Sequence, residues 1–231
     1  MGHTIQRNVK EVLDRIRAAA ERAGRSPDSV RLVGISKTVG PDAVRAAFEA
    51  GVRVFGENFI QEAREKTNVL SDLPVEWHFT GHLQTNKAKY AARMFHLIHT
   101  VDSLKLAREL DKRANIEGKV QDVLVQVNVA GEAAKWGVDP AGAVELVREA
   151  ARLPNMRIRG LMTMPPFSDD PEDSRPHFQA LAKLAREIES LAIPGVSMAE
   201  LSMGMTNDYE FAVEEGATLV RVGTALFGER R

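Results

Sequence analysis

Hydrophobic and polar residues follow two patterns along this chain. Short runs rich in valine, isoleucine and leucine predict buried strands. Longer segments with apolar residues three or four positions apart predict helices. Residues 5–23 form the first such helix, because Ile5, Val9, Val12 and Ile16 share one stripe of it. After this helix the order strand, turn, helix repeats through the rest of the chain.

The repeat predicts eight strands and the helices between them. The strands are expected at residues 30–38, 52–56, 76–81, 97–102, 123–128, 157–163, 198–202 and 218–223. The helices are expected near residues 41–50, 60–70, 86–93, 104–114, 139–153, 174–191 and 207–215. Strands that alternate with helices are typical of parallel sheets, and eight such strands close a barrel.

We therefore predict an α/β chain with a single (β/α)8 TIM barrel domain over residues 1–231 and an additional N-terminal helix. An open nine-stranded sheet and an eight-stranded doubly wound sheet are the alternatives. Neither has its sequence signal, because no strand is followed by Gly-x-Gly-x-x-Gly and the chain has no Gly-x-x-x-x-Gly-Lys-Ser/Thr.

Composition narrows the functional classes. The chain of 231 residues has 31 basic and 32 acidic side chains and a formal charge of −1. This overall charge does not indicate binding to nucleic acid or to an anionic membrane. It contains no cysteine, so disulfides, zinc-thiolate sites and cysteine nucleophiles are excluded. No apolar segment approaches the roughly 20 residues of a membrane helix. We expect a soluble cytoplasmic protein.

Lys37 ends the first predicted strand, the run 30–38. A lysine amine at the end of a buried strand is partly desolvated, which lowers its pKa toward the reactive neutral form. Such an amine can condense with an aldehyde or a ketone to a Schiff base. The alternative is a lysine whose stem packs on the barrel and whose amine simply reaches solvent.

Polar residues stand at the carboxyl ends of the predicted strands, which is the active face of such barrels. They are Lys37, Asn58, Thr80 to His82, Asp102, Asn128, Thr163, Ser202 and Arg221. Asn58, Asp102 and Asn128 also suit ordinary turns and helix caps.

Two glycine-containing turns near the end of the chain suggest an anion site. Residues 201–208 and 221–225 each lead from a strand to a helix start, where backbone N–H groups are available. The loops after strands seven and eight are also where barrels frequently hold phosphate. Two capped turns are the simpler alternative for either loop. Arg221 lies inside the last strand and needs an acceptor, either a structural carboxylate or a ligand atom near Lys37.

Histidines and hydrolase motifs give no further site. His96 and His99 are three residues apart on a strand-like segment and should point to opposite faces, and His78 and His82 have no clustered carboxylates. We therefore expect no metal site. The chain has no Gly-x-Ser-x-Gly motif either, so a serine hydrolase is not supported.

Several motifs, in order and at matching spacing from about residue 30 to the C-terminus, resemble one known family. They are Ser36-Lys37-Thr38, Phe55-Gly56-Glu57-Asn58 with Gln61-Glu62, residues 77–87 (WHFTGHLQTNK), residues 201–208 (LSMGMTND) and residues 220–228 (VRVGTALFG). On these residues the chain resembles the YggS/PROSC family of pyridoxal phosphate homeostasis proteins.

The resemblance implies an alanine racemase N-terminal domain-like barrel with pyridoxal 5′-phosphate (PLP) bound as an aldimine on Lys37. It also implies that Ser202, Gly223 and Thr224 hold the phosphate and that Gly204 allows close approach. Arg221 would face the pyridine nitrogen; because arginine keeps its proton, that nitrogen would stay unprotonated and the ring would be a weak electron sink.

The resemblance also concerns two further features. Asn58 matches a residue of the family's pocket, and its contact there is open. The loop of residues 130–139, with Lys135 and Trp136, looks like a family loop near the pocket, and it suggests no role for its lysine.

The resemblance implies binding and supply of PLP to apo-enzymes that use it, without established turnover, by a protein that we expect to be a monomer. Alanine racemases need a second base, a tyrosine from an additional β-domain, whereas Tyr90 and Tyr209 of this chain are predicted in helices. A PLP-dependent racemase-like enzyme is the main alternative. An aldolase that uses Lys37 without a cofactor is the weaker one.

Overall fold

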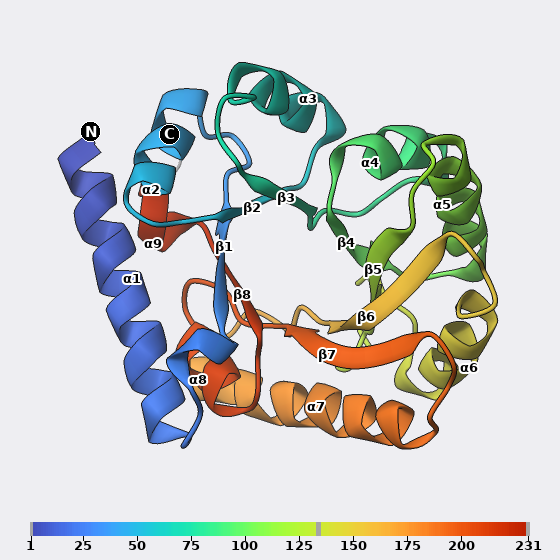
Figure 1. Cartoon of the computed structure of the whole chain (residues 1–231). Helices are drawn as coiled ribbons and strands as arrows, with labels where there is room; N and C mark the ends of the chain where they lie inside the picture. Colours follow the sequence, from blue (N-terminus) through green and yellow to red (C-terminus); the bar gives the residue numbers. More distant parts are fainter. Residues whose placement is uncertain (1, 133–134, 230–231) are drawn as a thin grey trace.

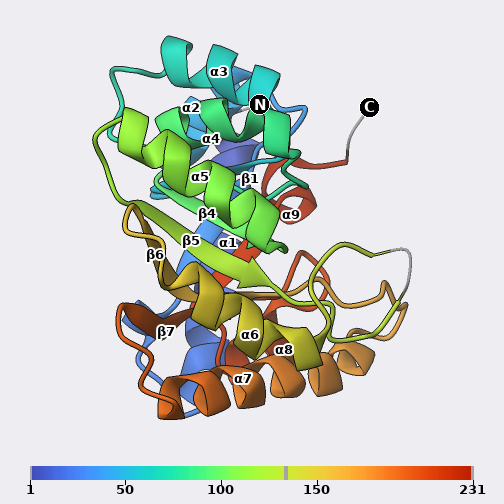
Figure 2. The same ribbon diagram turned by 90° about the vertical axis from the view of Figure 1, so that its right-hand side faces the viewer.

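The computed structural model of the chain, which describes residues 2–132 and 135–229, contains a closed barrel (Figures 1 and 2). In these residues, eight parallel strands pair in sequence order and β8 pairs with β1. The strands are β1 (Arg31–Ile35), β2 (Val54–Glu57), β3 (Glu76–Phe79), β4 (Leu97–Val101), β5 (Gln121–Gln126), β6 (Met156–Met162), β7 (Val196–Ser202) and β8 (Leu219–Val222). The predicted fold class is confirmed.

Helices surround this barrel, as the repeat predicts (Figure 1). The α-helices are α1 (Gly2–Arg22), α2 (Pro41–Glu49), α3 (Ile60–Val69), α4 (Ala88–Met94), α5 (Leu104–Ile116), α6 (Pro140–Ala150), α7 (Arg175–Ser190), α8 (Tyr209–Glu214) and α9 (Thr224–Phe227). Short 3-10 turns lie at Pro27–Ser29, Thr85–Lys87 and Pro171–Ser174. Tyr90 and Tyr209 lie in α4 and α8, as expected. Among the described residues, no helix has the length and hydrophobicity of a membrane span.

Most strand boundaries differ from the predicted ones by one to three residues, and two of these differences involve polar side chains. The first strand ends at Ile35, and Lys37 follows in a turn. The fifth begins at Gln121, earlier than its apolar run, because the buried amide of Gln121 donates to the carbonyl groups of Phe95 and His96. A polar residue can therefore belong to a buried strand when its donor group is paired, although Gln121 Oε1 has no partner among the described residues.

The long helix α1 covers the barrel where the closing helix is short. A (β/α)8 barrel needs a helix after each strand, but α9 after β8 spans only Thr224–Phe227. Helix α1 packs beside α2, α8 and α9 and covers this seam (Figure 1). The Asn8 side-chain amide donates to the Leu226 carbonyl oxygen at 3.1 Å, which ties α1 to α9.

Apolar side chains fill the barrel interior in one small cluster. Its members come from six strands and are Val33, Ile35, Val54, Leu97, Leu124, Met162 and Leu219. A larger core lies between the strands and the helices and includes Phe55, Ile98, Ile158 and Val220. The two clusters fix the strands from both sides, so their carboxyl ends hold side chains in defined places.

A buried ion pair supports the chain just before Lys37. The Lys66 amine of α3 donates to Glu57 Oε1 at 2.7 Å and to the Ser36 carbonyl oxygen at 2.5 Å. The Ser36 hydroxyl also donates to Glu57 Oε1, at 2.6 Å. Glu62 Oε2 accepts from the Lys66 amine and from the Thr38 backbone N–H, so the same cluster holds the turn on both sides of Lys37.

Burial is the main influence on the charge of Glu57. Its side chain is fully buried, and desolvation raises the pKa of its carboxyl above the ordinary 4.5, opposed by the hydrogen bonds from Lys66 and Ser36. A raised carboxyl pKa favours the folded state at low pH, and this contribution is lost as the pH rises through the folded pKa. The ion pair with the Lys66 amine offsets part of this loss of stability, because it favours the charged form of Glu57.

We expect Lys66→Met to destabilise the protein strongly and in a pH-dependent way. The variant leaves the Glu57 carboxylate buried without its cation, which costs about 3–5 kcal/mol of unfolding free energy near pH 8. The cost should fall near pH 5, because the Glu57 pKa rises further and the carboxyl can take up a proton. Urea unfolding at both pH values measures it.

The matched control is Lys183→Met, which removes an exposed lysine 3.8 Å from Glu187 on α7. Exposed pairs of this kind contribute about 0–1 kcal/mol. Equal losses for the two variants, or a Lys66→Met loss that does not change with pH, would contradict the role given to the buried pair.

Candidate functional site

A cavity of about 320 Å³ opens at the carboxyl ends of the strands. Its described lining comes from the loops after β1, β2, β3, β6, β7 and β8. A cavity of this size suits one small ligand. The position agrees with the rule that (β/α)8 barrels carry their sites at this face.

Five of the seven predicted site residues line this cavity: Lys37, Asn58, Arg221, Gly223 and Thr224. Closure of the barrel brings them together, because β1 pairs with both β2 and β8. Ser202 and Gly204 are not among the described residues of the lining. The structure thus gathers residues separated by more than 180 positions around one space.

The turn that carries Lys37 is held in an unusual backbone conformation. Thr38 has a φ of 63°, which is rare for a β-branched residue. Its backbone N–H donates to Glu62 Oε2 at 2.7 Å, which stabilises the turn. Lys37 itself is half-buried. Strained backbone of this kind persists where the surrounding structure fixes it, and it is typical of functional sites.

Arg221 reaches the cavity from β8 and is held by two neutral acceptors. Its Nη1 donates to Ser202 Oγ at 2.7 Å, and its Nη2 donates to the Thr163 carbonyl oxygen at 2.8 Å. Burial lowers the pKa of its guanidinium to about 10, so the group stays charged at neutral pH. The sequence suggests a structural carboxylate or a ligand atom as the acceptor for Arg221. The carboxylate is wrong, since both hydrogen bonds go to neutral oxygens, and the contact with a ligand atom stays a prediction.

Ser202 lies beneath Arg221, inside the barrel. Its hydroxyl accepts from Arg221 and also contacts His99 Nδ1 at 2.8 Å. Its part in phosphate binding therefore stays a prediction, while its support of Arg221 is direct. Gly204 has a φ of 87°, and a Cβ there would lie 2.9 Å from the Tyr209 Cα. Glycine is needed at this position for the close packing of the turn against α8.

The two glycine-containing turns meet at the cavity. Residues 205–208 line it after β7, and Gly223 and Thr224 line it after β8. Asp208 orders the first turn, because Oδ1 accepts from the Met205 backbone N–H at 2.6 Å and Oδ2 accepts from the Ser174 hydroxyl at 2.9 Å. The start of α9 contributes residues whose backbone N–H groups have no partner within the helix.

Thr80, one of the polar residues that the sequence places at the strand ends, closes one side of the cavity and donates to Asn58 Oδ1 at 2.9 Å, which orients that amide. The sequence missed other residues of the lining. Met164, Pro166 and Phe167 form an apolar wall from the loop after β6. The Pro165-Pro166 pair marks a loop, but its position over the cavity follows only from the fold. A flat ligand with an anionic group fits this combination of an apolar wall, two cations and hydroxyl groups.

The loop of residues 130–139 lies partly outside the described residues, since 133 and 134 are not described. The Trp136 ring stacks on the His82 ring with centroids 3.5 Å apart. The Lys135 amine lies 3.2 Å from Glu132 Oε2. No described residue of this loop belongs to the cavity lining. Lys135 is consequently a suitable comparison for Lys37.

Comparisons with known proteins agree with this arrangement. The family model for the alanine racemase N-terminal domain matches residues 8–231. A pyridoxal phosphate homeostasis protein of Aquifex aeolicus (strain VF5) is 48% identical over 223 residues, which cover 96% of this chain and 97% of that protein. The protein of the same name from Escherichia coli (strain K12) is 39% identical over 229 residues, which cover 98% of this chain and 97% of that protein.

Two solved structures are also similar to this chain. PipY of Synechococcus elongatus PCC7942, whose structure was determined with PLP bound, is 40% identical to this chain, with a TM-score of 0.81. The match covers 92% of this chain and 98% of the PipY chain. An alanine racemase of Clostridium difficile 630 is 14% identical with a TM-score of 0.74, covering 96% of this chain and 60% of its own, and shows likeness of fold alone. The chain belongs to the alanine racemase N-terminal domain family and, within it, to the pyridoxal phosphate homeostasis proteins.

Proposed function

We propose that this chain binds PLP as a Schiff base on Lys37 and maintains the intracellular supply of this cofactor without catalytic turnover. One observation carries the proposal: Lys37, Arg221 and both glycine-containing turns line one cavity. The PLP-bound PipY, 40% identical, supports the choice of ligand. We further propose a cytoplasmic monomer, and apo-enzymes that use PLP as recipients.

The described residues suit the parts of this ligand. The amine of Lys37 is the group that can hold an aldehyde covalently. Gly223 and Thr224 at the start of α9 are the proposed phosphate contacts, with Ser202 and Gly204 shaping the turn beside them. Asn58, fixed by Thr80, is the proposed polar contact on the opposite side. When bound, PLP supplies a reactive aldehyde that recipient enzymes need.

Arg221 favours storage over catalysis. Its guanidinium keeps its proton at neutral pH, so it can donate a hydrogen bond to the ring nitrogen but does not transfer a proton to it. The ring is then a weak electron sink. Neither tyrosine is among the described residues of the lining, so no tyrosine is placed there to act as a second base. The racemase-like alternative therefore lacks the tyrosine base that alanine racemases need.

The covalent link is tested with Lys37→Ala. We expect wild-type protein mixed with PLP to gain a visible absorption band, and the variant to gain none, because no other amine lines the described cavity. Borohydride reduction followed by peptide mass spectrometry should place the adduct on Lys37. Lys135→Ala is the control and should keep the band. A band of wild-type size in Lys37→Ala would contradict the assignment.

The phosphate contact is tested with Thr224→Val, which removes a hydroxyl and keeps the side-chain shape. We expect PLP affinity to fall about tenfold or more, since a hydrogen bond to a charged group contributes about 1.5–3 kcal/mol. The affinity for pyridoxal, which lacks the phosphate, should not change. Fluorescence titration with both compounds measures this.

Thr80→Val is the matched control, because Thr80 lines the cavity from β3 and contacts Asn58. It should alter the affinities for PLP and pyridoxal by the same factor. Ser202→Ala decides the role of that residue: a loss confined to PLP indicates a phosphate contact, and equal losses indicate support of Arg221. Equal losses in Thr224→Val would contradict the phosphate assignment.

Supply and turnover are separated by two measurements on the PLP-loaded protein. We expect an apo-enzyme that needs PLP to regain activity when it is mixed with the PLP-loaded protein. The comparison is the same apo-enzyme mixed with free PLP, and an aldehyde trap is present in both mixtures. L-amino acids incubated with the loaded protein should keep their chirality and their α-protons, because the ring is a weak electron sink. Sustained racemisation would exclude a carrier without turnover.

A further inference from the structure

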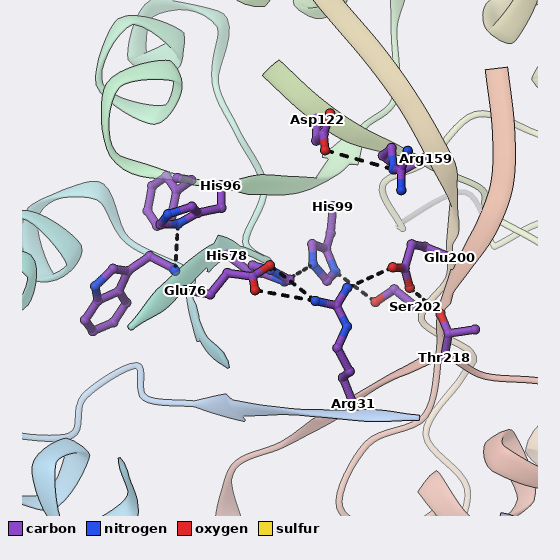
Figure 3. Close-up of polar contacts among 12 residues, drawn as sticks. Arg31, Glu76, His78, His96, His99, Asp122, Arg159, Glu200, Ser202 and Thr218 are labelled. Atoms are coloured by element: carbon purple, nitrogen blue, oxygen red, sulfur yellow. Dashed lines mark hydrogen bonds and ion pairs between the residues drawn. The ribbon is translucent and has the colours of Figure 1, made fainter. Parts of the chain in front are cut away.

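A chain of hydrogen bonds crosses the barrel interior and ends at Arg221. Glu76 Oε1 lies 2.8 Å from His78 Nε2, and His78 Nδ1 lies 2.9 Å from His99 Nε2. His99 Nδ1 then lies 2.8 Å from Ser202 Oγ, which accepts from Arg221 Nη1 at 2.7 Å. Figure 3 shows His99 between His78 and Ser202. These five residues, here called the interior chain, come from β3, β4, β7 and β8.

The two ends of the interior chain fix the direction of every bond in it. Arginine can only donate, so Ser202 Oγ accepts from it and can give its single hydroxyl proton to His99 Nδ1. The Glu76 carboxylate at the other end can only accept, and with both imidazoles neutral this makes Ser202 the donor to His99. A neutral His99 then carries its proton on Nε2 and donates to His78 Nδ1. His78 in turn carries its proton on Nε2 and donates to the Glu76 carboxylate, which can only accept.

The surroundings keep both imidazoles neutral and Glu76 ionised. Desolvation lowers the pKa of His78 and lowers that of His99 well below 6.5. The hydrogen bond from His78 lowers the pKa of Glu76 to about 2. Each imidazole therefore has one donor and one acceptor nitrogen at neutral pH, as the assigned directions require.

Glu76 belongs to a second cavity, at the amino-terminal ends of the strands. This cavity of about 510 Å³ is also lined by Arg31, Arg159 and Glu200. Arg31 donates to Glu76 at 3.3 Å and to Glu200 at 2.8 Å (Figure 3). Glu200 accepts from the Thr218 hydroxyl and forms no hydrogen bond or ion pair with the described histidines. The two glutamates thus share Arg31 but differ in their access to the interior chain.

We propose that Glu76, His78, His99 and Ser202 are positioning residues that hold the Arg221 guanidinium in the ligand cavity from the opposite end of the barrel. The chain gives a buried cation a strongly polarised acceptor, because hydrogen bonds in series reinforce one another at low dielectric. The identity of the ligand rests on the proposed function, whereas the direction of the bonds is a property of the protein without ligand.

This arrangement explains how Arg221 can be stabilised and still attract an anion. A carboxylate in direct contact with Arg221 would neutralise it and repel a phosphate ester. The carboxylate of the described lining, Asp208, accepts from Met205 and Ser174, and Arg221 is bound instead by a hydroxyl and a carbonyl oxygen. Asp208 raises the pKa of Arg221 by its nearby charge without a hydrogen bond to it, and the interior chain adds a link to the Glu76 carboxylate at the far end of the barrel.

The direction of the chain can be measured by nitrogen NMR on protein without ligand. We expect His78 and His99 both to carry their proton on Nε2 at pH 7. Glu76→Gln should produce a mixture of tautomers at His99, which Glu76 does not touch, because a glutamine amide can donate as well as accept. Glu200→Gln is the matched control and should leave His99 unchanged.

Three outcomes would overturn the proposal: a proton on Nδ1 of His99 in the wild type, equal spectra for Glu76→Gln and the wild type, or equal effects of the two glutamine variants. If Glu76→Gln does not fold, Ser202→Ala gives the same readout, since His99 Nδ1 loses its donor and its nitrogen resonance should shift. An unchanged resonance there would also overturn it.

The effect on the ligand cavity is measured with PLP as the probe. We expect Glu76→Gln to weaken PLP binding several-fold and to shift the visible absorption band, while Glu200→Gln changes neither. If wild-type protein does not bind PLP, the proposed function fails. The NMR result still decides whether the hydrogen bonds of the interior chain run in the assigned direction. If PLP binds equally well to both variants, the support of Arg221 from Glu76 is refuted.

Discussion

The pairing of β1 with β8 is the constraint on which the ligand cavity depends. Val33 lies opposite Arg221 in this pairing, so the register that closes the barrel also brings the turn of Lys37 near the guanidinium. Without closure the two cations would lie at opposite edges of a sheet. The hydrophobic clusters inside and outside the strands stabilise the closed form, and the chemistry of the cavity follows from it.

Much of the fold could be predicted from the sequence, because strands buried on both faces appear as apolar runs and helices as amphipathic segments. The boundaries were harder where polar residues take part. Gln121 extends a strand through amide hydrogen bonds, and Ser36 ends one early by joining the cluster of Glu57 and Lys66. Five of the predicted site residues line the cavity because strand ends converge in a barrel.

The interior chain could not be predicted in the same way, because its members come from distant parts of the sequence. From the sequence, His78 and His99 can be judged only as metal ligands, and no cluster of carboxylates stands beside His78. One signal was nevertheless present: Glu76 stands two positions before His78, on the same face of a strand, where their side chains can interact. The partnership with Ser202 depends on barrel closure alone.

The contact between α1 and α9 also affects how the protein is made. The Asn8 amide and the Leu226 carbonyl oxygen meet across 218 positions of sequence, so α1 completes its packing only after the much later α9 has been synthesised. Such long-range contacts slow folding. While β8 is being added, α1 can already pack against α2 and α8, but the seam that α9 closes is still open. Apolar side chains at this seam are exposed until then, and exposed apolar surface of this kind favours aggregation.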